Sequence, residues 1–165
     1  MGVEDIPTND IPRQELGEAS EKEAVISPEI IKSTGDFQEA FQKHDKKLWL
    51  MGSLSIATHL GSPHRNIEND IDFFTTAEGV DEVIIDLEDR GFVVEEGWGN
   101  KFRATNPETG IRADVAMLDI NPQTGNYEVA DWSFPASGFA EDEKEIEGVS
   151  VRPISLEMLT VMKKK

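Results

Sequence analysis

The amino-acid sequence predicts one α+β domain in which helices flank a mixed β-sheet. Helical and strand-like patterns alternate through the first half of the chain, and strand-like patterns separated by turns fill most of the second half. A length of 165 residues with 38% hydrophobic residues suits a single globular core. We place this domain at residues 29–165.

Residues 1–28 are predicted to form a flexible acidic leader. This segment is polar, contains three prolines, and is expected to be loose or partly helical. The first helix is expected to begin at Asp36, because an aspartate followed three residues later by Glu39 is a capping-box pattern.

The later elements follow from hydrophobic spacing and from turn residues. Apolar residues at i, i+3, i+4 and i+7 from Val80 predict a helix, and Gly91 is placed as its C-terminal cap. Ser155 is placed to cap a closing helix. In chain order, we predict a strand at 48–51, a helix at 54–60, a loop at 61–69, a strand at 70–74, a helix at 79–90, strands at 92–94, 101–105, 111–118, 127–130 and 149–153, and a helix from residue 156.

Composition narrows the functions that the chain can have. With 16 basic and 33 acidic residues, the formal net charge of −17 disfavours nucleic acid and anionic membranes and favours cations or cationic small molecules. The alternative is that the charge serves solubility or a salty habitat. The absence of cysteine excludes disulfides and thiolate catalysis. The first residues lack a signal-peptide pattern and no apolar run could span a bilayer, which predicts a cytoplasmic protein without a membrane partner.

An Asp-Ile-Asp triplet at residues 70–72 is the central candidate for chemistry. Side chains two apart on a strand share a face, so the carboxylates of Asp70 and Asp72 are expected to lie side by side. Such charges repel unless a cation lies between them, and paired hard oxygens suit Mg²⁺ or Mn²⁺. The alternative is a solvated acidic strand end, because chance alone supplies about one such triplet in so acidic a chain.

A strand-to-helix turn at Gly52 and Ser53 precedes this triplet. Glycine lets the backbone approach a phosphate closely, the N-terminus of a helix offers free N–H groups, and the Ser53 hydroxyl can add a donor. The alternative is an ordinary turn in which Ser53 is the N-cap of the helix.

Asp114 is the polar exception in an alternating segment, with Ala116 and Leu118 on its face. A carboxylate in that setting usually has a cation or a hydrogen-bond partner. If the strand at 111–118 pairs with the strand at 70–74, Asp114 becomes the third carboxylate of a cluster close enough to share a metal. The alternative is a surface aspartate close to a turn.

The order of these motifs resembles the nucleotidyltransferase superfamily. The chain is similar to the branch that holds aminoglycoside, lincosamide and toxin-type nucleotidyltransferases in the stretch WLMGSLSIATHLGSPHRNIENDIDFF. In that branch, an apolar strand, a Gly-Ser turn, a helix, a Gly-x-x-x-Arg loop and Asp-Ile-Asp follow one another. The strand that carries their third acidic residue is similar to RADVAMLDINPQTGNYE. The segment that leads into their lysine-bearing helix is similar to EIEGVSVRPISLEMLTVMKKK. Relatives usually continue beyond the position of Lys165, so we expect a minimal or a truncated form.

The resemblance implies a metal-dependent enzyme that moves a nucleoside monophosphate from a nucleoside triphosphate, such as ATP, to a hydroxyl of an acceptor. An aminoglycoside or lincosamide, with a role in antibiotic resistance, would suit the charge. Two alternatives stay open: a non-catalytic nucleotide- or partner-binding module of the same fold, and a toxin-type enzyme that modifies tRNA. The implied catalytic and metal-holding residues are Asp70, Asp72 and Asp114, with Asp114 alternatively a general base, and the implied nucleotide-binding residues are Gly52, Ser53, Arg65 and Lys163.

Overall fold

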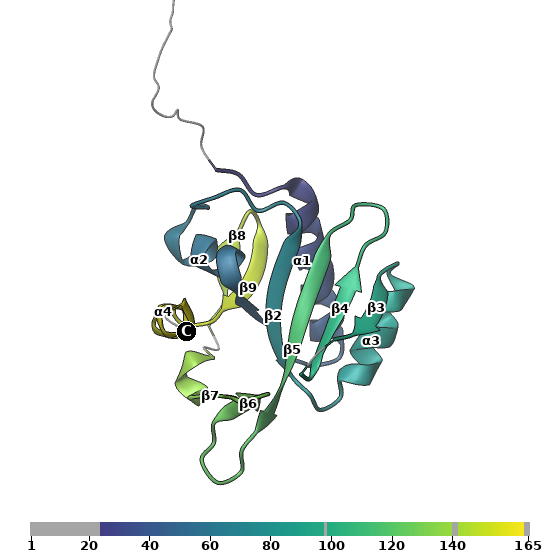
Figure 1. The fold of residues 1–165 in the computed structure, drawn as a ribbon. Helices are drawn as coiled ribbons and strands as arrows, with labels where there is room; N and C mark the ends of the chain where they lie inside the picture. The colour runs from purple at the N-terminus through teal and green to yellow at the C-terminus, as the bar shows by residue number, and fades with distance from the viewer. Residues whose placement is uncertain (1–23, 98, 140–141, 164–165) are drawn as a thin grey trace, which may run out of the picture.

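The computed structural model describes residues 24–97, 99–139 and 142–163, and it confirms the predicted α+β fold (Figure 1). The helices are α1 (Pro28–Lys43), α2 (Gly52–Leu60), α3 (Val80–Asp89), the 3₁₀ helix η1 (Ala136–Gly138) and α4 (Leu156–Lys163). The strands are β1 (Trp49–Met51), β2 (Asp70–Thr76), β3 (Val93–Glu96), β4 (Lys101–Thr105), β5 (Arg112–Ile120), β6 (Tyr127–Val129), β7 (Trp132–Phe134), β8 (Lys144–Ile146) and β9 (Val149–Pro153).

The strands of the described residues form one mixed sheet in the order β3-β4-β5-β2-β1-β9-β8, and the β6–β7 hairpin extends from β5. β2 lies at the centre, parallel to β5 and antiparallel to β1 (Figure 1). Helices α1 and α3 lie behind the sheet in the same view. None of the helices in these residues is long and apolar enough to cross a bilayer.

Alternation along β2 divides the hydrophobic interior into two clusters. Ile71 and Phe73 pack in a cluster with residues of α1 and α3, whereas Phe74 packs on the opposite face with Trp49 and with Met158 of α4. Because side chains alternate along a strand, Asp72 shares the face of Phe74. One face of the sheet therefore carries both an apolar cluster and the candidate carboxylates.

The first helix begins eight residues earlier than predicted, so its expected start at Asp36 is wrong. The Ser27 hydroxyl accepts a hydrogen bond from the Ile30 N–H at 3.3 Å, and Pro28 occupies the first helical turn, where its fixed φ and missing N–H are tolerated. Asp36 lies inside the helix. Ile26, which we had placed in the leader, pairs with Ile67, and residues 1–23 of that leader lie outside the described residues.

The sequence pattern missed two short strands, β7 and β8. Each has only three residues, and most of their side chains are exposed, so they lack the apolar alternation that marks a half-buried strand. β8 joins β9 through Glu147 and Gly148, whose φ angles of 50° and 84° suit a two-residue hairpin turn. The pairing partner, and not the local hydrophobic pattern, makes these segments strands.

A buried ionic group connects α1 to α3. The Asp86 carboxylate, on α3, accepts a hydrogen bond from Arg90 at 3.0 Å and lies 3.2 Å from the His44 ring and 3.7 Å from the Lys43 ammonium group. Burial by itself would raise the pKa of Asp86, but the hydrogen bond and charge of Arg90, with Lys43 and His44, lower it below its usual value.

We expect Asp86→Asn to lower the free energy of unfolding at neutral pH by about 1–3 kcal/mol, because Arg90 loses a charged partner in a buried setting. Since the folded state lowers the pKa of Asp86, this stabilisation is present above the unfolded pKa of about 3.9 and is lost as the pH falls through the lower folded value. Urea unfolding at several pH values measures it. Asp36→Asn removes an exposed i,i+4 pair with Lys32 and should change stability by less than about 0.5 kcal/mol. Equal losses in the two variants would contradict the prediction.

Candidate active site

The register of β2 with its neighbours brings the predicted carboxylates onto two adjacent strands. Asp72 lies opposite Asp114, and Asp70 lies opposite Arg112. Directly paired residues of neighbouring strands point to the same face of a sheet. The predicted pairing of these two strands is therefore confirmed, and the three carboxylates share one face.

Gly52 lies next to this group of carboxylates. It starts α2 directly after β1, has a φ of 75°, and follows Met51, which pairs with Asp72. A Cβ atom built on Gly52 would lie only 2.9 Å from an oxygen of the Asp72 carboxylate. Glycine is thus required here both for its left-handed backbone and for the space that Asp72 occupies. No side chain caps α2, so the alternative in which Ser53 is the N-cap is wrong.

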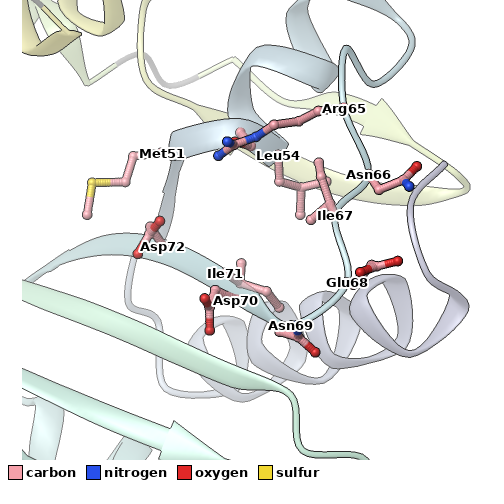
Figure 2. Close-up of a pocket in the computed structure, with 11 residues that line it drawn as sticks. Met51, Leu54, Arg65, Asn66, Ile67, Glu68, Asn69, Asp70, Ile71 and Asp72 are labelled. Atoms are coloured by element: carbon pink, nitrogen blue, oxygen red, sulfur yellow. The ribbon is translucent and has the colours of Figure 1, made fainter. Parts of the chain in front are cut away.

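Ser53 is instead held by Arg65. The Arg65 Nε donates a hydrogen bond to the Ser53 hydroxyl at 2.9 Å, and a second guanidinium nitrogen also donates to it. These side chains border a hollow of about 300 Å³, with Asp70 and Asp72 on its other side (Figure 2). The N-terminus of α2 and the arginine attract negative charge, whereas the aspartates repel it unless a cation is bound.

Asp72 is the most electrostatically strained group of the site. It is half-buried and, among the described residues, forms no hydrogen bond or ion pair. Burial raises the pKa of its carboxyl, and the charges of Asp114 and Asp70 raise it further, while Lys101 and Arg103 oppose them in part. A carboxylate in this position gains more than its neighbours from an added cation.

The two other carboxylates are each paired with an arginine. Arg112 donates to Asp70 at 2.9 Å, and Arg103 donates to Asp114 at 2.7 and 3.2 Å. In these positions, no three acidic, histidine or cysteine side chains of the described chain are arranged to hold a metal ion. The donor set itself fits Mg²⁺ or Mn²⁺, because it offers only hard oxygens and, among the described residues, leaves Asp72 without a direct ion-pair partner.

Sequence reasoning did not identify Arg103 or Arg112 as part of the site. Each lies on a strand that was predicted at almost its observed bounds, but the register that places them beside Asp114 and Asp70 was not predictable from either strand alone. The implied nucleotide ligand Lys163 is the last residue of α4, and its side chain lies outside the described structure, so its role stays a prediction.

The mixed sheet, the glycine turn at the start of α2 and the acids of two adjacent strands define the nucleotidyltransferase fold. Within this class, the family model for aminoglycoside-2″-adenylyltransferase matches residues 36–162, and the chain belongs to that family of enzymes. A search of the curated proteins found no significant match.

Solved structures show the same fold. The solution structure of the antibiotic-resistance factor ANT(2″)-Ia has a TM-score of 0.66 and 23% identity, covering 79% of this chain and 68% of that one. The lincomycin-bound lincosamide antibiotic adenylyltransferase LnuA has a TM-score of 0.63 and 20% identity, covering 85% of this chain and 86% of that one. A crystal structure of ANT(2″)-Ia with adenylyl-2″-tobramycin has a TM-score of 0.63 and 23% identity, covering 77% of this chain and 70% of that one.

The contact between Gly52 and Asp72 predicts a non-additive pair of substitutions. Gly52→Ala and Gly61→Ala both place a side chain at a positive φ, which costs about 1–2 kcal/mol, but only at Gly52 does the new Cβ meet a neighbour. We expect Gly52→Ala to be the more destabilising change in thermal unfolding. In an Asp72→Ala background the two glycine substitutions should cost the same. A persistent difference in that background would show that Asp72 is not the obstacle.

Removing the charge of Asp72 should stabilise the metal-free protein. We expect Asp72→Asn to raise the melting temperature at neutral pH by about 2–4 °C, the shift that about 1 kcal/mol gives in a chain of this size. Because the fold raises the pKa of Asp72, its charge destabilises the protein above the unfolded pKa, and the gain should vanish as the pH falls through the raised value. Asp81→Asn, at an exposed position in the first turn of α3 where a negative charge is favourable, is the control and should not stabilise. A lower melting temperature for Asp72→Asn in a chelating buffer contradicts this account.

Proposed function

We propose that the chain is a metal-dependent nucleotidyltransferase that moves a nucleoside monophosphate from a nucleoside triphosphate to a hydroxyl of a small cationic acceptor. The observation that carries this proposal is the register of Asp72 with Asp114, next to a glycine turn that leaves room for the Asp72 carboxylate. Membership of the adenylyltransferase family supports it and favours ATP as the donor.

The turn at the start of α2 binds the triphosphate. The N–H groups of Gly52 and Ser53 lie in the first turn of the helix, where backbone donors have no partner within the helix. Arg65 adds a positive charge at the hollow beside them. Lys163 is proposed as a further phosphate contact, on the resemblance alone.

Asp70, Asp72 and Asp114 would hold a divalent cation, Mg²⁺ or Mn²⁺, which would supply charge neutralisation for the attacking and leaving oxygens. The acceptor hydroxyl oxygen forms a bond to the α-phosphorus, and the bond from that phosphorus to the bridging oxygen of the β-phosphate breaks. Pyrophosphate leaves with the bond electrons. A carboxylate oxygen of Asp114 would accept the proton of the acceptor hydroxyl.

The charge of the protein supports a small cationic acceptor over nucleic acid. With a net charge of −17, the chain opposes the approach of a polyanion and attracts an amine-bearing molecule. Two structural neighbours are described with lincomycin and with adenylyl-2″-tobramycin, so an aminoglycoside or a lincosamide is the acceptor class that we propose. Such an activity would confer antibiotic resistance.

The test measures pyrophosphate release with ATP, Mg²⁺ and a panel of aminoglycosides and lincosamides. We expect Asp72→Asn and Asp114→Asn to lower kcat by at least about 100-fold, because each removes a charge that neutralises the transferring phosphate. Asp119→Asn, on the same β5 strand as Asp114 but opposite Glu128, should keep wild-type turnover.

Two results would overturn the proposal. One is wild-type turnover in both active-site variants. The other is a folded wild-type protein that binds ATP with Mg²⁺ and releases no pyrophosphate with any acceptor of the panel, which would indicate a binding module of the same fold. Turnover with tRNA, and with none of the small molecules, would identify the toxin-type activity.

A further inference from the structure

A row of charged side chains crosses the sheet at the candidate site. Glu95 of β3 lies opposite Arg103 of β4, Arg103 lies opposite Asp114 of β5, and Asp114 lies opposite Asp72 of β2. Because paired residues share a face, the charges along this row are negative, positive, negative and negative. Arg103 is therefore the one cation of the row, and it lies directly beside the pair of acids.

The contact between Arg103 and Asp114 uses both carboxylate oxygens. The Arg103 Nε lies 2.7 Å from Oδ1 and a terminal guanidinium nitrogen lies 3.2 Å from Oδ2. This two-pronged geometry is the strong form of an arginine–carboxylate pair. The side chains are 45% and 34% exposed, so the pair lies at the surface of the site and has room to rearrange.

Lys101 shows that a nearby positive charge alone does not produce this contact. It precedes Arg103 by two residues on β4 and so shares its face, opposite Ala116. Within the described residues it forms no hydrogen bond or ion pair with an acid of the site, and it affects Asp72 only through its charge. Arg103 differs from Lys101 because it occupies oxygens that a cation would need.

We propose that Arg103 is a positioning residue that holds the oxygens of Asp114 while no divalent cation is bound, and that it must release them before Asp114 can join Asp70 and Asp72 in holding one. The proposal rests on the function proposed above. Arg103 and the cation compete for the same lone pairs, and the guanidinium charge also repels the incoming ion. Arg103 therefore lowers the cation affinity of the nucleotide-free protein and biases the site against loading by the metal alone.

Direct Mn²⁺ binding to the nucleotide-free protein tests this competition without any need for turnover. Free Mn²⁺ is measured by electron paramagnetic resonance at fixed ionic strength, and binding that survives in Asp72→Asn is subtracted as binding to the rest of the acidic surface. We expect Arg103→Met to bind Mn²⁺ at the site about fivefold more tightly than the wild type, the gain expected from the loss of one partly exposed ion pair.

Two further variants separate competition for the oxygens from a general charge effect. Lys101→Met removes one positive charge from the same face of β4, two residues before Arg103, and it should tighten Mn²⁺ binding by less than about twofold. Arg103→Lys keeps the charge but loses the two-pronged contact, and it should fall between the wild type and Arg103→Met. Thermal unfolding measures whether each variant is folded. If Arg103→Met does not fold, Arg103→Gln takes its place.

Each outcome decides the question. Equal or weaker site binding in Arg103→Met overturns the proposal, since an arginine that only orients Asp114 would aid the metal. An equal gain in Lys101→Met also overturns it. If Asp72-dependent Mn²⁺ binding exists but does not respond to Arg103, only this inference fails. If no variant shows Asp72-dependent binding, the metal site of the proposed function fails as well. Binding that becomes detectable only in Arg103→Met supports both.

Discussion

The repulsion between Asp72 and Asp114 is the constraint on which the rest of the structure depends. Two like charges face each other across neighbouring strands, and burial makes the ionised form of Asp72 still less favourable. The fold holds them together through the ladder of β2 and β5, which extends from Asp70 to Thr76 on one strand. The reverse sides of both strands are buried in the larger apolar cluster, which offsets the repulsion.

The same alternation that builds the two clusters also places the site. Ile71 and Phe73 point to the side of α1 and α3, so Asp70 and Asp72 must point to the other side. Phe74, two residues after Asp72, packs on that second face with Trp49 and residues of α4. A slip of one residue in β2 would turn Asp72 into the apolar cluster beside α1 and α3 and would move Phe73 out of it, so packing of the core and placement of the site fix each other.

Much of this could be predicted from the sequence, and the failures have physical causes. The strand at 101–105 and the strand at 149–153 were predicted at their observed bounds, because both alternate clearly. Ser27 was missed as a helix start because the Asp36 pattern matched a capping box, although the serine–proline pair supplied a hydroxyl and a fixed φ earlier. Asp72 and Gly52 were identified separately, whereas their contact depends on the pairing of β1 with β2, which no local pattern specifies.

The arginines explain how so acidic a chain can keep an acidic cluster on an open face. With a net charge of −17, the average field of the protein opposes any further negative charge, so the three carboxylates need local cations to be tolerated. Arg112 pairs with Asp70 and Arg103 pairs with Asp114, whereas Asp72, directly opposite Asp114 in the register, has no such direct partner among the described residues. The unbalanced charge is thus concentrated at the aspartate that also touches the Gly52 turn. Under the proposed function, a cation at that point would neutralise Asp72 and would bring positive charge next to the first turn of α2, so metal and triphosphate binding would reinforce each other.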